Sequence, residues 1–308
     1  GSLRLFQKKI TPVQLDDQVQ RLRVALEKPY TAPEGKAIGF ELYRWLVEPV
    51  EPLLADQYVK TLVMVPDGVL RDVPLAALHD GQRFLIERYR LALMPSLQLA
   101  LPQPSTRDSM KVLAAGLSES RAGFAPLSFV PDELKAVVQA IPGKTLLNRQ
   151  FTTRAIANAI TESSITTLHL ATHGQFSSTI DRTFVLAWDK PITLYDLRDL
   201  IEKRRQPSQK AIDLLVLSAC ETATGDRRAA LGLAGVAAQS GTRSTVATLW
   251  NIDDESSGVF MKYFYDALAK PGTSKAEALQ AAQLMLLQDP DYRHPFHWAA
   301  YVLVGSWR

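Results

Sequence analysis

Two apolar segments of this chain each lead into a side chain that can carry out acid–base or nucleophilic chemistry. Residues 168–172 are followed by His173 and Gly174, and residues 214–219 are followed by Cys220. A thiolate is the nucleophilic form of cysteine, and an imidazole beside it can take the thiol proton and later return it to a leaving amine. If the two segments are neighbouring strands, this pattern predicts a His173–Cys220 dyad for acyl transfer.

The main-chain amides next to this pair could hold a developing oxyanion. Gly174 has no side chain, so a substrate carbonyl can approach its N–H closely, and the N–H of Cys220 would be the second donor. Two plainer interpretations stay open, namely His173 as a hydrogen-bonded core histidine and Cys220 as a small buried hydrophobe. The glycine after the histidine and the matching cysteine segment favour the catalytic interpretation.

The segments around this pair alternate between expected strands and helices. Several expected strands are apolar throughout, which is typical of a mainly parallel sheet covered by helices on both faces. In such sheets, functional groups collect beyond the carboxyl ends of the strands. The pair is 220 − 173 = 47 residues apart, which leaves room for one short strand and one crossover helix. The expected strands cover residues 61–65, 91–94, 111–116, 144–147, 165–172, 183–187, 212–218, 244–250 and 299–304, and the expected helices cover residues 13–27, 39–57, 131–140, 153–160, 193–205, 227–240, 255–269 and 274–288.

The composition and the single cysteine limit the classes of function. The chain has 308 residues, of which 46% are hydrophobic, and a formal net charge of +3, which gives no electrostatic reason to expect nucleic acid. One cysteine cannot form an internal disulfide or a cysteine-rich zinc site, and it suits a reducing cytoplasm. No segment has the length and apolarity of a membrane span, and none resembles a signal peptide.

A polar, proline-rich segment at residues 102–108 is the best candidate for a linker. It predicts two parts, an N-terminal part at residues 1–105 that is largely helical and a core at residues 106–308 that carries the reactive pair. The chain opens on Gly1-Ser2 and then begins abruptly, which predicts further native sequence upstream.

Several spaced motifs resemble the CHAT family, relatives of caspases and separases in which a His-Gly and a Cys follow two successive core strands. The resemblance covers roughly residues 36–308, so it is more specific than a single pattern match. The motifs are Val65-Pro66-Asp67-Gly68, Pro74-Leu75-Ala76-Ala77-Leu78, His169-Leu170-Ala171-Thr172-His173-Gly174, Leu217-Ser218-Ala219-Cys220-Glu221-Thr222, Ala247-Thr248-Leu249-Trp250, Phe264-Tyr265 and Trp298-Ala299-Ala300-Tyr301.

The resemblance implies a caspase-like three-layer α/β fold, with residues 1–105 as a helical and pseudo-caspase-like part of the CHAT region. It implies a separase-like thiol protease that needs no cofactor, cleaves protein or peptide substrates and is gated by an upstream domain or an activator protein. A role in bacterial defence or cell death is a family-level expectation. Ser218-Ala219-Cys220-Glu221 departs from the caspase cysteine signature, which argues against specificity for aspartate. The alternative is a catalytically silent caspase-like scaffold that binds partner proteins.

Two acidic residues follow the expected strand at residues 244–250. Asp253 and Asp254 suit the start of the next helix, where an acidic side chain caps the free amides. In separases, an acidic residue after a similar Leu-Trp strand lines the pocket for a basic side chain, and Asp254 matches that position better than Asp253. The resemblance therefore implies a preference for Arg or Lys before the cut, and the capping interpretation stays open beside it.

The remaining histidines give little support for a metal site. His169 precedes His173 by four residues, a spacing that places a metal-binding pair on one face of a helix but not of a strand. His294 and His297 flank Pro295 and are interpreted as loop or packing residues. We therefore expect no metal ion. The competing hypothesis, a metal-dependent hydrolase, predicts that a chelator abolishes activity.

Overall fold

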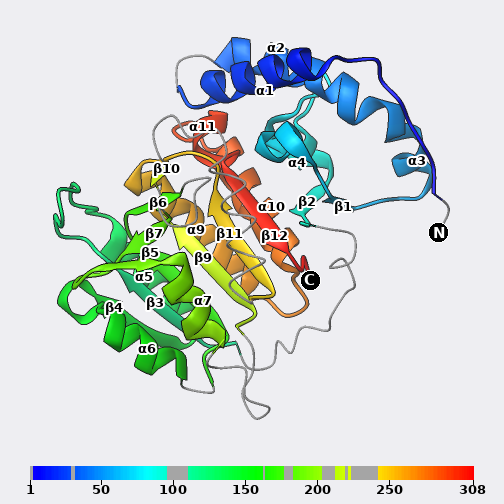
Figure 1. Cartoon of the computed structure of the whole chain (residues 1–308). Coiled ribbons are helices and arrows are strands. Elements are labelled where there is room, and N and C mark those ends of the chain that lie inside the picture. The colour runs from blue at the N-terminus through cyan, green and yellow to red at the C-terminus, as the bar shows by residue number, and fades with distance from the viewer. Residues whose placement is uncertain are drawn as a thin grey trace.

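The central feature of the fold is an eight-stranded sheet with a smaller four-stranded sheet beside it (Figure 1). The computed structural model describes residues 3–28, 32–95, 110–161, 164–176, 183–202, 212–218, 221–222 and 242–308. In spatial order, the large sheet contains β1 (Thr61–Met64), β2 (Arg90–Leu93), β12 (Tyr301–Gly305), β11 (Ser244–Thr248), β9 (Leu214–Ser218), β5 (Thr167–Ala171), β3 (Val112–Gly116) and β4 (Gly143–Leu147). The small sheet contains β10 (Glu221–Thr222), β6 (Gly174–Phe176), β7 (Phe184–Leu186) and β8 (Pro191–Thr193).

The large sheet is mainly parallel, as the apolar strands predicted. Every pair of neighbours in it is parallel except β11 and β12. Consequently β12, β2 and β1 run opposite to the other five strands. The strands β3, β5, β9 and β11 are buried at all their positions. Full burial of a strand requires cover on both faces of the sheet.

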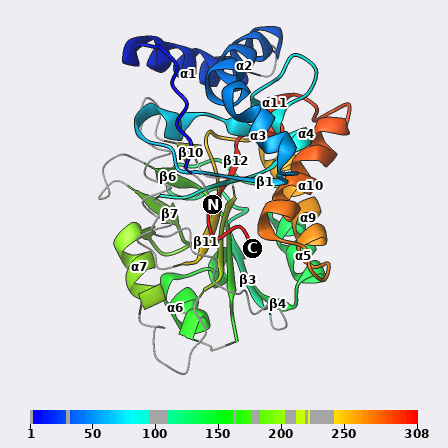
Figure 2. The same ribbon diagram turned by 90° about the vertical axis from the view of Figure 1, so that its right-hand side faces the viewer.

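Helices supply that cover and make three layers (Figure 2). One face carries α5 (Val130–Ala140), α9 (Asp254–Leu268) and α10 (Lys275–Gln288), and the other carries α6 (Thr153–Thr161) and α7 (Leu194–Glu202). The alternation of side chains along β9 serves both layers. Leu214 and Val216 belong to the apolar cluster that includes α5, α9 and α10, while Leu215 and Leu217 belong to the cluster of α6 and α7.

The N-terminal part consists of helices and of the two strands β1 and β2. Its helices are α1 (Pro12–Leu26), α2 (Ala32–Leu46), the 3-10 turn η1 (Glu48–Val50) and α3 (Glu51–Asp56), followed by two further 3-10 turns, η2 (Gly68–Asp72) and η3 (Leu75–Ala77), and by α4 (Leu85–Arg88). A helix was expected at residues 39–57, with Pro49 and Pro52 expected to kink or divide it. The structure divides this segment into the end of α2, η1 and α3. The two prolines lie in the first turns of η1 and α3, the part of a helix that tolerates proline.

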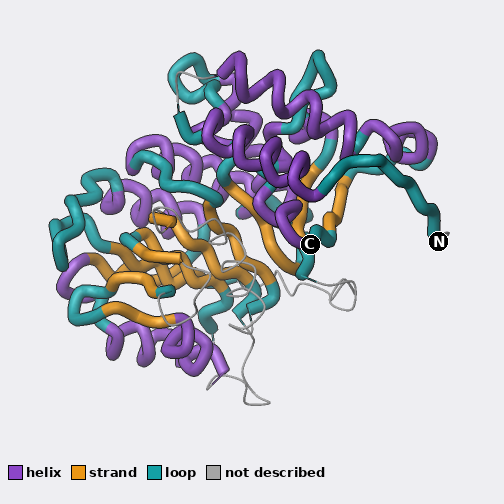
Figure 3. The backbone as a smooth tube through the Cα atoms, turned by 45° about the horizontal axis from the view of Figure 1, so that its top comes forward, coloured by secondary structure: helices purple, strands orange, loops and turns teal. Residues whose placement is uncertain are grey.

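This N-terminal part lies on the core rather than apart from it. Figure 3 shows α1 and α2 beside each other at one end of the molecule. The buried guanidinium of Arg23 on α1 donates to the carbonyl oxygen of Leu249 at 2.8 Å, just beyond the carboxyl end of β11. Apolar residues of both parts belong to one cluster, for example Leu22 and Trp298. The linker expected at residues 102–108 lies outside the described residues, so the division at residue 105 stays a prediction.

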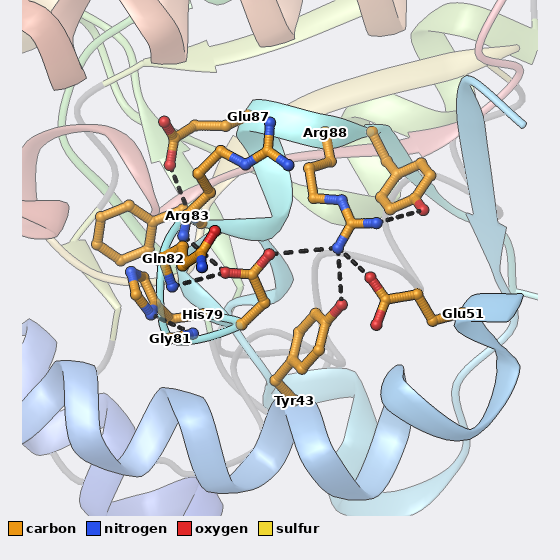
Figure 4. A network of polar contacts seen from close by, with 11 residues as sticks. Tyr43, Glu51, His79, Gly81, Gln82, Arg83, Glu87 and Arg88 are labelled. Carbon is orange, nitrogen blue, oxygen red and sulfur yellow. Dashed lines mark hydrogen bonds and ion pairs between the residues drawn. The ribbon is translucent and has the colours of Figure 1, made fainter. Parts of the chain in front are cut away.

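A polar network around Arg88 fastens the helices of this part to one another (Figure 4). Its guanidinium lies 3.1 Å from the hydroxyl of Tyr43 and 3.2 Å from the carboxylate of Asp80, and it also pairs with Glu51. Burial and then the hydrogen bond with Glu51 raise the pKa of Tyr43, so that its hydroxyl keeps its proton. Arg88 therefore joins α2, α3 and the turn before α4.

Candidate active site

Neighbouring strands bring the His173 segment and the Cys220 segment to one edge of the sheet. The strands β5 and β9 are parallel neighbours, and Ala171 at the end of one lies opposite Ser218 at the end of the other. Beyond these ends the two segments pair again, since β6 and β10 are parallel and Gln175 lies opposite Glu221. Ala219 and Cys220 themselves lie outside the described residues.

His173 has a defined hydrogen bond on one ring nitrogen. Its Nε2 lies 2.7 Å from the carbonyl oxygen of Ala125. A carbonyl can only accept, so Nε2 carries the proton in this contact, and Nδ1 of the neutral ring has the free lone pair. The ring of Phe124 stacks on the imidazole with centroids 4.8 Å apart and an interplanar angle of 23°. His173 thus lies half-buried with Nδ1 as its available base.

The loop at residues 118–129 supplies both of these contacts. A bridge between Arg121 and Phe124 closes a tight turn in which Gly123 has φ +88°, a backbone conformation that favours glycine. The guanidinium of Arg121 donates to the carbonyl of Trp188 at 2.8 Å and lies 4.3 Å above the indole ring. At the start of the loop, the side chain of Asn148 accepts the N–H of Ser118 at 2.8 Å. The loop is therefore held at its start and at its tip.

Asp253 is the N-cap of α9, as one of the two interpretations of the sequence expected. Its carboxylate accepts the N–H of Ser256 at 2.8 Å and lies 3.1 Å from Nδ1 of His297. Burial opposes ionisation, but the hydrogen bonds from His297 and Ser256 outweigh it and lower the pKa of Asp253 to about 2. Asp253 is therefore ionised at neutral pH.

Asp254 has a different partner from its neighbour. Its Oδ2 accepts the main-chain N–H of Phe129, the last residue of the 118–129 loop, at 2.6 Å. Burial raises the pKa of Asp254, as do the negative charges of Glu133 and Asp253, while the Phe129 amide and His173 oppose the rise. Its Oδ1 is covered and has no hydrogen-bond partner among the residues that the structure describes.

A buried polar group beneath the loop was not expected from the sequence. The Nε2 of His169 lies 3.0 Å from the carboxyl of Glu133 on α5, and its Nδ1 lies 3.2 Å from the hydroxyl of Tyr265 on α9. All three residues are buried, and burial raises the pKa of Tyr265 well above its usual value. His169 therefore joins β5 to two helices, in agreement with a structural role.

A second buried polar group lies at the end of β9. The hydroxyl of Ser218 is 2.9 Å from that of Ser257 on α9, which in turn is 3.2 Å from the hydroxyl of Tyr301. Ser218 precedes Cys220 by two residues, so this contact holds the strand that leads to the cysteine. The only sequence signal for it was a hydroxyl residue at the end of an otherwise apolar strand.

The last two histidines help to fold the segment before β12. His294 caps α11 (Pro295–Trp298), where its Nδ1 accepts the N–H of Phe296 at 3.0 Å. Burial lowers the pKa of His294. His297 pairs with Asp253, and the described part of the chain contains no group of His, Cys, Asp and Glu residues suited to a metal ion. Within the same part, no helix has the length and apolarity needed to cross a bilayer.

The three layers and the strand order define a caspase-like cysteine-proteinase fold. The chain is similar to the crystal structure of the Arg-specific cysteine proteinase gingipain R, with a TM-score of 0.50, 10% sequence identity and 95% of this chain and 73% of that chain covered. It is also similar to a complex of the pro- and mature domains of RgpB of Porphyromonas gingivalis, with a TM-score of 0.50, 11% identity and coverage of 95% and 74%. At these identities the likeness extends to the fold alone.

The chain belongs to the CHAT domain family, whose model matches residues 36–306. Among curated proteins it is similar to tetratricopeptide repeat protein 28 of Mus musculus, with 24% identity over 80% of this chain, and to the Homo sapiens protein of that name, with 23% identity over the same share. The chain spans 12% of the length of each of these relatives.

Proposed function

We propose that this chain is a cysteine endopeptidase in which Cys220 is the nucleophile and His173 the general base and acid. Membership of the CHAT family and the caspase-like fold support the proposal. The main geometric support is the pairing of the two segments on both sides of the site. Ala171 lies opposite Ser218 before His173 and Cys220 in the sequence, and Gln175 lies opposite Glu221 after them.

The proposed reaction uses the free nitrogen of His173. Nδ1 takes the proton from the thiol of Cys220, and the thiolate attacks the scissile carbonyl to form a tetrahedral oxyanion, which the N–H groups of Gly174 and Cys220 hold. The C–N bond then breaks as the imidazolium gives its proton to the leaving amine. Water, deprotonated by the same nitrogen, hydrolyses the thioester and restores the thiol. The hydrogen bond to Ala125 keeps Nε2 out of these transfers.

Labelling of the thiol tests the pair without a known substrate. Because Cys220 is the only cysteine, alkylation by iodoacetamide reports on it alone. We expect the wild-type protein to react at least tenfold faster at pH 7 than a free thiol, since an adjacent base increases the thiolate fraction. His173→Gln should remove this advantage, while the control His294→Gln should keep it. Equal rates for the wild type, both variants and a free thiol would overturn the dyad.

The specificity part of the proposal is a preference for a basic residue before the cut, recognised by Asp254. A carboxylate in a covered position can form a strong charge-assisted bond with Arg or Lys. Since Oδ1 of Asp254 is covered in this structure, entry of a basic side chain requires the residues over it to move aside. Sequencing of the products from a peptide library, with Cys220→Ala as the blank, tests this. The preference is wrong if Arg and Lys are not enriched before the cut.

Gating by another domain or protein is the regulatory part of the proposal. The curated relatives are named for tetratricopeptide repeats, and one similar structure holds a pro-domain together with its mature domain. A partner protein of this kind would act most simply by rearranging loops around the candidate site. Limited proteolysis and peptide cleavage measured with and without a candidate repeat domain test this part.

A further inference from the structure

Helix α9 contacts each of the three segments that shape the candidate site. Tyr265 reaches His169 on β5, the strand that leads to His173. Ser257 reaches Ser218 on β9, the strand that leads to Cys220. Asp254, in the first turn, reaches the 118–129 loop through the amide of Phe129. The first two contacts hold strands that the sheet already fixes, whereas the third holds a loop.

The loop is the part of this arrangement that most needs an external anchor. Asn148 fixes its start and Arg121 fixes its tip, but Phe124 and Ala125, which contact the imidazole, lie between that tip and Phe129. The bond from a carboxylate to a main-chain N–H is among the stronger hydrogen bonds in proteins. Here it joins residues that are 254 − 129 = 125 positions apart in the chain. The N–H of Leu127 also donates to the carbonyl of Ser118 at 3.2 Å, and Phe129 is the N-cap of α5. Loss of the Asp254 contact would therefore remove the hydrogen bond that joins the loop to α9, while these contacts remain.

We propose that Asp254 is a positioning residue that holds the 118–129 loop against His173. Through Phe129 it keeps the Ala125 carbonyl on Nε2 and the Phe124 ring on the imidazole, and so leaves Nδ1 as the proton acceptor. This inference rests on the proposed function of His173, and it gives Asp254 a second role that uses Oδ2, whereas recognition of a basic substrate would use Oδ1. Holding the loop requires a hydrogen-bond acceptor at Oδ2, whereas recognition of a basic side chain requires the negative charge of the carboxylate.

The burial of Asp254 favours this role over simple capping of the helix. A carboxylate in a first turn also interacts with the helix dipole, but an exposed side chain would serve that purpose without a desolvation cost. Asp254 is partly buried, has Glu133 and Asp253 as like charges nearby, and still accepts only one main-chain hydrogen bond among the described residues. Asp253 already caps the helix. The contact of Asp254 with Phe129, the residue at which the loop meets α5, therefore explains its position.

Three variants separate the two roles. Asp254→Ala removes the acceptor, Asp254→Asn keeps an acceptor without the charge, and Glu255→Gln is the matched control, because it removes a charge from the same turn without contacting the loop. The readouts are hydrogen exchange of the Phe129 amide, the ring-current shift of the His173 Cε1–H caused by Phe124, and the alkylation rate of Cys220. If Asp254→Ala does not fold, Asp254→Leu replaces it.

With Asp254→Ala, we expect exchange of the Phe129 amide to rise about tenfold or more, which corresponds to roughly 1.4 kcal/mol of lost protection. The His173 signal should move toward its unstacked position, and alkylation should slow about tenfold. Asp254→Asn should keep most of all three properties, and Glu255→Gln should keep them all. If Asp254→Ala only lowers the melting temperature and leaves the His173 signal unchanged, the positioning role is wrong.

The same variants, with KM and kcat for basic peptides measured as well, separate this inference from the proposed function. If the Phe129 and His173 signals change while alkylation of Cys220 stays constant in every variant, the positioning role holds and the dyad fails. If Asp254→Asn keeps the His173 signal but raises KM for basic peptides without lowering kcat, the second oxygen serves the substrate as proposed. If both variants leave KM unchanged, Asp254 positions the loop only.

Discussion

The buried carboxyl of Asp72 should make the protein less stable as the pH rises. Asp72 ends the turn η2 and is 4% exposed, and its Oδ1 has no hydrogen-bond partner among the described residues. Burial is the largest cause that raises its pKa, and the charge of Asp16 adds to it, while Arg23 and Arg71 oppose the rise. The pKa is raised from 3.8 to about 6. Ionisation at neutral pH therefore has a cost in folding free energy.

The size of this cost follows from the shift in pKa. A group whose folded pKa exceeds its unfolded pKa binds more protons in the native state, so stability falls as the pH rises between the two values. The window for Asp72 runs from about pH 4 to about pH 6. The shift of about 2 units corresponds to about 3 kcal/mol, all of which is lost above the window. Asp72→Asn imitates the protonated form, so it should stabilise the protein at pH 7 by up to this amount.

Thermal unfolding at several pH values checks the prediction. We expect Asp72→Asn to melt several degrees higher than the wild type at pH 7 and at nearly the same temperature at pH 4, since 1 kcal/mol moves Tm by about 2 °C in a domain of this size. The control Asp17→Asn changes an exposed carboxylate on α1 and should follow the wild type throughout. A gain that is equal at pH 4 and pH 7, or a loss at pH 7, would refute the argument from burial.

Three further substitutions test other contacts. Glu133→Gln should lower the free energy of unfolding by about 1–3 kcal/mol, because it leaves His169 without its buried carboxylate; an unchanged Tm would contradict this. Arg88→Met should cost about 2 kcal/mol and loosen the N-terminal helices first, which hydrogen exchange can localise; exchange that rises uniformly would argue against a local role. Ser274→Ala should cost about 1 kcal/mol by removing the capping box with Glu277, and urea unfolding against the conservative Ser274→Thr measures it.

The sequence predicted the core of the sheet because the relevant signal is local. The strands β3 and β9 are short, almost wholly apolar runs, and such runs indicate strands that are buried on both faces. The strands β5 and β11 also contain polar residues, and the structure buries these as well. That β5 and β9 are neighbours was a condition of the sequence argument, which the resemblance to the CHAT family implied, and the structure confirms it. The expected helix at residues 227–240 lies outside the described residues and stays a prediction.

The small sheet could not be predicted in the same way. The strands β6, β8 and β10 have three, three and two residues, too few to show an alternation of polar and apolar positions. They form because partners far away in the chain align them, and β10 lies 221 − 175 = 46 positions from its partner in β6. The described residues between His173 and Cys220 therefore contain two more strands than the spacing alone indicated.

The support around His173 was hidden from the sequence for a related reason. A cap such as Asp253 has a local signature, because its partner Ser256 is three positions away. The bond from Asp254 to Phe129 and the contact of His169 with Glu133 join residues with no periodic relation. Only the placement of α5 and α9 on one face of the sheet brings these residues together.

The two acidic residues at the start of α9 respond differently to acid, and this has a consequence for the site. Hydrogen bonds hold the pKa of Asp253 at about 2, whereas burial raises the pKa of Asp254. As the pH falls, Asp254 takes up a proton before Asp253 does, so the charge-assisted bond to the Phe129 amide weakens while the helix cap remains. The loop over His173 should therefore loosen in acid before α9 frays, an order that amide exchange at Phe129 and Ser256 can measure. The reverse order would show that the cap, and not the loop, depends on the buried carboxylate.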